Sequence, residues 1–120
     1  MIKRDQWKWY GNVAHNCVGP WCRFHLATEI GSYLVSTVGE YFSPHKSEKE
    51  CPEKPSEVGC GRLYETYVFR LKGRRCEAKD CGCGIHFPDY YKEIDSLAAN
   101  DAKKATANHY ELCEKYAHAR

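Results

Sequence analysis

Cysteine and histidine residues crowd into two stretches of the chain whose spacings suit a metal ion. The first stretch spans residues 15–25 and holds four such residues, His15, Cys17, Cys22 and His25. Structural zinc sites use four nitrogen or sulfur ligands in a tetrahedron and draw them from short loops of this kind. Gly19 and Pro20 supply a turn that would bring the two sulfurs together. We therefore predict a zinc site here. The alternative is a solvent-facing His25 on a strand beside ordinary buried thiols.

The second stretch combines a cysteine-rich knuckle with a pair of residues on a helix. His109 and Cys113 are four residues apart, so a helix points both side chains from one face. We predict a second zinc site in which the ligands are Cys76, Cys81, Cys83 and Cys113. His109 is the main substitute ligand, and His86 is a further one. In the alternative, His109 and Cys113 are core residues and the thiols bind no metal.

The cysteines also indicate in which cellular compartment the protein is found. Eight of them could form four disulfides in a secreted scaffold. Residues 1–9 carry positive charge, but no apolar stretch of a signal peptide follows them. We therefore expect a reducing cytoplasm with zinc as the cofactor, and keep a disulfide-stapled secreted domain as an alternative. We assign neither a metal-binding nor another role to Cys51 and Cys60.

The predicted zinc sites are structural rather than catalytic. Neither stretch places a carboxylate as the His-Glu-x-x-His or His-x-Glu…Pro-Cys-x-x-Cys zinc enzymes do. Four ligands for each ion also leave no open coordination position. The alternative is a small metal-dependent nuclease or hydrolase that uses His15, His25 and either Glu29 or Glu40.

Two stretches interleave basic and aromatic residues, a pattern that suits phosphate contact with base stacking. The residues predicted to touch nucleic acid are Lys8, Trp9, Arg70, Lys72, Arg74 and Arg75. Taken singly, each stretch favours another interpretation: Trp7 and Trp9 are more typical of residues that cover the core, and the Arg/Lys run is more typical of a solvated turn. The net charge of +2 identifies no nucleic-acid protein. We expect a protein partner, with nucleic acid as the second possibility and the oligomeric state open.

A small sheet must position these residues. Residues 22–30 and 33–41 are β-branched and apolar runs separated by Gly31 and Ser32, which predicts a hairpin with Ile30 opposite Tyr33. The face predicted to be buried carries Phe24, Leu26, Thr28, Ile30, Tyr33, Val35, Thr37 and Tyr41. A third strand over 64–71 completes a three-stranded antiparallel sheet.

The rest of the chain divides into loops and helices. Residues 43–61 are rich in proline and charge, which predicts a long surface loop, and 73–88 form an irregular knuckle. Helical spacing of apolar residues predicts a helix over 101–118, capped by Asn100 or Asp101, and a shorter helical turn near 90–98. No apolar run approaches the roughly 18 residues that span a bilayer. The prediction is a single α+β domain over 1–120, a three-stranded antiparallel sheet with Cys/His zinc knuckles and a C-terminal helix.

Several stretches resemble a family of small uncharacterised bacteriophage and prophage proteins. They are Cys22-Arg-Phe-His-Leu-Ala-Thr, Tyr33-Leu-Val-Ser-Thr-Val-Gly-Glu-Tyr, Gly61-Arg-Leu-Tyr-Glu-Thr-Tyr-Val-Phe, Cys81-Gly-Cys-Gly and Ala105-Thr-Ala-Asn-His-Tyr-Glu-Leu-Cys-Glu-Lys. The resemblance implies the cytoplasm of an infected bacterium, which favours zinc over disulfides. It also implies a host or phage macromolecule as partner, such as a defence or regulatory component, and no particular mechanism.

Overall fold

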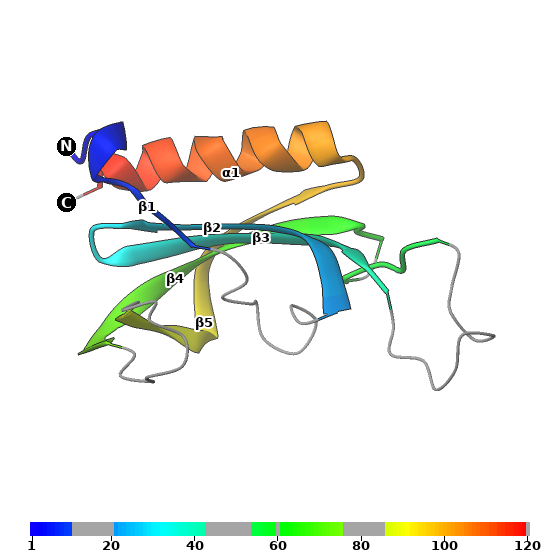
Figure 1. Cartoon of the computed structure of the whole chain (residues 1–120), viewed down its shortest axis with the longest axis horizontal. Helices are drawn as coiled ribbons and strands as arrows, with labels where there is room; N and C mark the ends of the chain where they lie inside the picture. Colours follow the sequence, from blue (N-terminus) through cyan, green and yellow to red (C-terminus); the bar gives the residue numbers. More distant parts are fainter. Residues whose placement is uncertain (11–20, 43–53, 60, 76–85, 120) are drawn as a thin grey trace.

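The chain folds into one antiparallel sheet with a helix packed across one face (Figure 1). The computed structural model describes residues 1–10, 21–42, 54–59, 61–75 and 86–119. In chain order the elements are η1 (Arg4–Gln6), β1 (Lys8–Tyr10), β2 (Cys22–Ile30), β3 (Tyr33–Tyr41), β4 (Tyr64–Arg75), β5 (His86–Ala99) and α1 (Ala102–Ala117). The five strands lie side by side in sequence order.

The hairpin of β2 and β3 forms as the sequence predicts. Ile30 pairs with Tyr33, and Gly31 takes a positive φ of 57° in the turn, a conformation that glycine adopts without a Cβ clash. The same register continues to the pair Cys22 and Tyr41. It turns Thr28, Ile30, Val35 and Thr37 toward α1, where all four are buried.

The predicted three-stranded sheet is wrong, because β1 and β5 add a strand at each edge. The predicted helical turn near 90–98 is also wrong, since those residues belong to β5. The three-residue spacing of Ile94 and Leu97 is typical of a helix. In the structure both pack against the core under α1, and β5 pairs with the long strand β4 through a register shift between Val68 and Phe69.

The predicted zinc knuckles are likewise not seen in the part of the chain that the structure describes. β4 runs to Arg75 and β5 starts at His86, so strands enter the predicted knuckle from both sides. Its three cysteines, Cys76, Cys81 and Cys83, lie outside the described residues.

The helix predicted over 101–118 is confirmed. The Asp101 carboxylate accepts a hydrogen bond from the backbone N–H of Lys104, which caps the N-terminus. The inner face of α1 buries Leu112 and Cys113 against Ile30, Val35 and Val68 of the sheet. Each fully buried aliphatic side chain of this kind contributes on the order of 2 kcal/mol. No described helix is long and apolar enough to cross a membrane.

The opposite face of the sheet is buried too, although the sequence pattern assigned burial to the α1 side. Ala27, Leu34 and Phe69 form a second core cluster there, with Tyr10, Tyr67 and Leu71 packed around it. Two carboxylates, Glu29 and Glu65, are also buried. The sheet therefore buries side chains on both of its faces, in two different clusters.

Candidate functional site

Two of the four residues predicted for the first zinc site are described, and both lie on β2. Cys22 is a buried free thiol, and burial together with the charge of Glu65 raises its pKa to about 11. His25 is half-buried, and its Nε2–H donates to the Cys22 carbonyl oxygen. His15 and Cys17 lie outside the described residues.

For the second predicted site, the structure describes the two helical residues. His109 and Cys113 both face the sheet from α1 and are fully buried. Burial raises the pKa of the Cys113 thiol to about 12. Cys76, Cys81 and Cys83 lie outside the described residues, and His86 opens β5 with its side chain outside them.

The His109 ring is held by hydroxyl groups at both nitrogens. Nε2 lies 2.8 Å from the Thr28 hydroxyl on β2, and Nδ1 lies 2.7 Å from the Thr37 hydroxyl on β3. Thr37 in turn lies 2.7 Å from the Thr66 hydroxyl on β4. Burial lowers the pKa of His109 to about 4, so the imidazole is neutral near pH 7. We call these four residues the threonine–histidine network.

This network ties α1 to three strands and gives each of its four buried side chains a hydrogen-bond partner. A metal ion at His109 would have to replace one of its two hydroxyl bonds. Within the described residues no three His, Cys, Asp or Glu side chains come together. The zinc sites therefore stay predictions.

The predicted contact residues Lys8 and Trp9 are neighbours on β1 and point to opposite faces. The Lys8 ammonium lies 3.7 Å from the buried Glu29 carboxylate. Trp9 lies on the α1 side with 45% of its surface exposed, and its ring centroid is 5.7 Å from that of Tyr110. Tyr110 is itself 37% exposed.

A cation completes this surface. The Arg4 guanidinium lies 5.5 Å from the centroid of the Tyr110 ring and 5.4 Å from that of Trp7. Its Nε donates to Glu114 Oε1 at 2.7 Å. We call Trp9, Tyr110 and Arg4 the aromatic patch. Sequence reasoning missed Tyr110, because no local pattern places it beside Trp9, which is distant in the sequence.

The second basic stretch lies elsewhere. Arg70 and Lys72 are exposed on β4, and the Arg70 guanidinium lies 5.4 Å from the Tyr33 ring centroid. Arg74 and Arg75 belong to β4, but their side chains lie outside the described residues. β2 and β3 separate β4 from β1, a distance of roughly 14 Å at the usual strand spacing. The structure does not bring the two stretches together.

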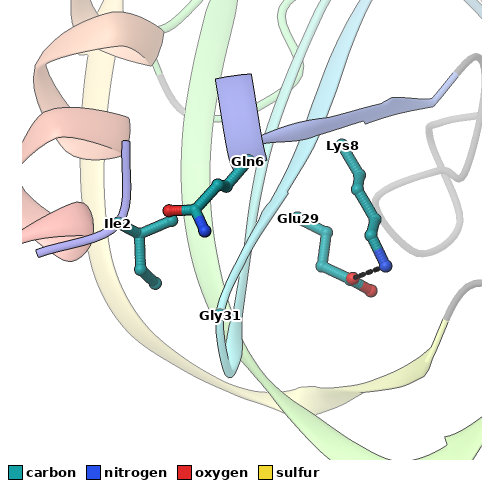
Figure 2. A pocket seen from close by; sticks show the side chains of 5 residues that line it. All are labelled: Ile2, Gln6, Lys8, Glu29 and Gly31. Carbon is teal, nitrogen blue, oxygen red and sulfur yellow. Dashed lines mark ion pairs between the residues drawn. The ribbon is translucent and has the colours of Figure 1, made fainter. Parts of the chain in front are cut away.

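A pocket of about 340 Å³ lies between the N-terminal segment and the β2–β3 turn (Figure 2). Its lining residues are Ile2, Gln6, Lys8, Glu29 and Gly31. Glu29 is the buried member, with 7% of its side chain exposed, whereas Lys8 is 58% exposed. The Lys8–Glu29 pair balances the charge of the lining, which suits a neutral polar group better than an ion.

Comparison with known proteins adds no relative: no family model, curated protein or solved structure matches the chain. The resemblance to phage proteins thus remains an expectation from the sequence, and function must be argued from the site.

Proposed function

We propose that this chain is a small phage-type binding domain that acts by binding a host or phage protein, as a regulatory or anti-defence factor. Zinc has a structural role in the proposal. The observation that carries it is the aromatic patch, in which two large rings are exposed side by side on a rigid support.

Exposed aromatic residues of this kind suit protein recognition. Tryptophan, tyrosine and arginine dominate the residues whose loss most weakens protein complexes. Trp9 rests 5.5 Å from the buried His109 ring, and Tyr110 is held on α1. Because both rings are already fixed, a partner that covers them loses little side-chain entropy.

The charges around the patch favour a protein over a nucleic acid. Arg4 pairs with Glu114, and Lys8 pairs with Glu29. Phosphate binding depends on cations that release counterions from the nucleic acid, and a nearby carboxylate opposes that attraction. A nearly neutral aromatic surface is more typical of a protein interface.

The chemistry beside the patch supports binding rather than catalysis. His109 is the histidine under Trp9, and hydroxyl groups occupy both of its ring nitrogens. A general base must reach the proton that it removes, and this buried ring is directed to Thr28 and Thr37 instead.

The experiment compares wild type with Trp9→Ala in affinity capture from a bacterial lysate, followed by mass spectrometry and a binding titration with the purified partner. Trp21→Ala is the matched control, because Trp21 is 49% exposed and lies directly before β2. We expect Trp9→Ala to weaken binding by about tenfold or more while Trp21→Ala leaves it unchanged. An equal affinity of the two variants would refute the proposal. A partner lost on nuclease treatment would indicate nucleic acid.

The structural role of zinc is tested separately by native mass spectrometry and thiol counting under denaturing, non-reducing conditions. We expect one or two zinc ions in each chain and free thiols after metal removal. A chain without zinc and without free thiols would support the disulfide-stapled alternative.

A further inference from the structure

The pocket beside the β2–β3 turn is built from segments that the fold holds in place. The Ile2 N–H donates to the Ala117 carbonyl oxygen of α1 at 2.8 Å, which ties the N-terminal segment to the helix. At the turn, Gly31 lies so close to Ile2 that a Cβ on it would be 2.6 Å from Ile2 Cδ1. The glycine backbone and the isoleucine side chain therefore form one fixed wall, as in most small-molecule sites, which are largely preformed.

Three polar side chains line the pocket, and each comes from a different element (Figure 2). They are Gln6 of η1, Lys8 of β1 and Glu29 of β2. Gln6 Oε1 accepts a hydrogen bond from the Lys3 backbone N–H at 3.0 Å, so its amide nitrogen is the end that can donate to a ligand. The Lys8 ammonium also donates, whereas the Glu29 carboxylate accepts. The lining thus offers two donors and one acceptor.

The spacing of the Lys8–Glu29 pair suits a ligand that bonds both residues at once. Lys8 Nζ lies 3.7 Å from Glu29 Oε2, which is longer than a charge-assisted hydrogen bond of about 2.8 Å. In a carboxamide the oxygen and the nitrogen are about 2.3 Å apart, from the lengths of the C=O and C–N bonds. Its oxygen can accept from Lys8 while its N–H donates to Glu29, and the two charges stay beside each other.

From this arrangement we infer that the pocket binds a primary carboxamide. A cationic ligand would meet the Lys8 ammonium and an anionic ligand would meet Glu29, so a neutral group is favoured. Hydrogen bonds to charged groups are stronger than those between neutral groups, and a carboxamide makes one to each member of the pair. The volume of about 340 Å³ is at the lower end of ligand pockets, which suits an asparagine or glutamine side chain or a small free amide.

Nuclear magnetic resonance titration of the full chain with butyramide tests the inference. We expect saturable shifts of the backbone N–H signals of Gln6, Lys8, Glu29 and Gly31, with a Kd in the millimolar range for so small a ligand. Butyrate has the same shape and a negative charge, and should bind at least about fivefold more weakly. The absence of saturable shifts up to about 200 mM butyramide would overturn the inference, as would equal binding of butyrate.

Two variants locate the site. Lys8→Met removes one donor and Glu29→Gln removes the charge of the acceptor, and each should raise the butyramide Kd about fivefold or more. Lys104→Met, an exposed change on α1, is the matched control and should leave the Kd unchanged. Lys8 has 58% of its side chain exposed, so Lys8→Met keeps the test valid if Glu29→Gln does not fold. A Kd unchanged by Lys8→Met would contradict the site.

A second titration identifies the source of the carboxamide. The peptide Gly-Gln-Gly, capped by acetyl and N-methylamide groups, represents a side chain of a partner protein, and the same peptide with glutamate is its control. Tighter binding of the glutamine peptide than of butyramide would support a partner's side chain as the ligand. The reverse order would support a small free amide.

This inference and the proposed function fail separately. Trp9 lies on the other face of the sheet from Lys8, so Trp9→Ala should leave the butyramide Kd unchanged. A chain that does not bind butyramide but loses its captured partner on Trp9→Ala would refute the carboxamide site alone. A chain that binds butyramide and keeps its captured partner on Trp9→Ala would refute the recognition role of the aromatic patch alone.

Discussion

The two faces of the sheet are both buried, but they bury different kinds of polar group. Under α1 the polar groups are neutral, and Thr28, Thr37, Thr66 and His109 form hydrogen bonds with one another. On the opposite face the buried groups include two carboxylates, with Lys8 at Glu29 and Arg62 at Glu65. A neutral network can be closed entirely within the protein, whereas a buried carboxylate depends on a cation that reaches it from the surface.

The comparison shows which residues are available for function. The α1 face is closed beneath the helix and exposes the rings of the aromatic patch at its edge. On the opposite face, Lys8 spans the boundary between the buried Glu29 and the pocket. The neighbouring β1 residues Lys8 and Trp9 thus have different roles on opposite faces of the sheet. Lys8 pairs with the buried Glu29, and Trp9 belongs to the aromatic patch.

The largest expected effects test whether both faces are true cores. Ile30→Ala on the α1 side and Leu34→Ala on the other side should each lower the free energy of unfolding by about 3 kcal/mol, because both side chains are fully buried. Urea denaturation monitored by circular dichroism measures the loss. A cost below about 1 kcal/mol for Leu34→Ala would show that the second face is covered only loosely.

The next largest effect is a loss of folding stability at low pH, which arises from His109 on the α1 face. The pKa of His109 is about 4 in the folded chain and 6.5 when exposed, so between these values the unfolded state binds more protons. Stability therefore falls as the pH is lowered from about 6.5 to about 4, by about 3 kcal/mol for this group. Denaturation of wild type and His109→Gln across this range measures it. The slope should be reduced in His109→Gln and retained in His118→Gln, whose residue is exposed.

A smaller effect should follow from opening the threonine–histidine network without changing its volume. Thr37→Val removes the hydroxyl that meets both His109 and Thr66, and should cost about 2 kcal/mol. Thr106→Val is the control, since the Thr106 hydroxyl only bonds the Ala102 carbonyl within α1. Thermal unfolding of the two variants gives the difference, and equal losses would mean that the network is not a cooperative unit.

The smallest effect compares two lysines of similar exposure. Lys8→Met removes the cation beside the buried Glu29 and should cost about 1 kcal/mol. Lys115→Met removes a closer ion pair, 2.6 Å from the more exposed Asp95, and should cost less because water screens that pair. A larger loss for Lys115→Met in urea denaturation would contradict the assignment of Lys8 to the buried carboxylate.

Local sequence signals predicted the elements that depend only on residues close together in the chain. The Gly31–Ser32 turn fixed the register of β2 and β3, and Asp101 with the apolar spacing of Leu112 and Cys113 fixed α1. The signals failed at β5, where the three-residue spacing of Ile94 and Leu97 is typical of a helix and the strand accommodates it through a register shift. They failed at β1 because a strand of three residues leaves no periodicity to detect.

Some residues of the candidate site could likewise be recognised from the sequence, whereas others became apparent only in the structure. His109 was recognised as a residue on the inner face of α1, but its partners Thr28, Thr37 and Thr66 come from three strands that are distant in sequence. Trp9 was singled out as an exposed contact, whereas its neighbour Tyr110 became visible only once α1 was docked. Contacts between distant segments carry no local pattern.

The sequence by itself determined a hairpin, a capped helix and a set of cysteines and histidines with metal-binding chemistry, because turns, caps and periodicity depend on neighbouring residues. Only the tertiary structure decided that the sheet has five strands and two buried faces. The two added strands form by pairing, β1 with the edge of β2 and β5 with the edge of β4. It also placed His109 between two hydroxyl groups and Trp9 beside Tyr110, because packing α1 against the sheet determines which side chains are enclosed and which face a partner.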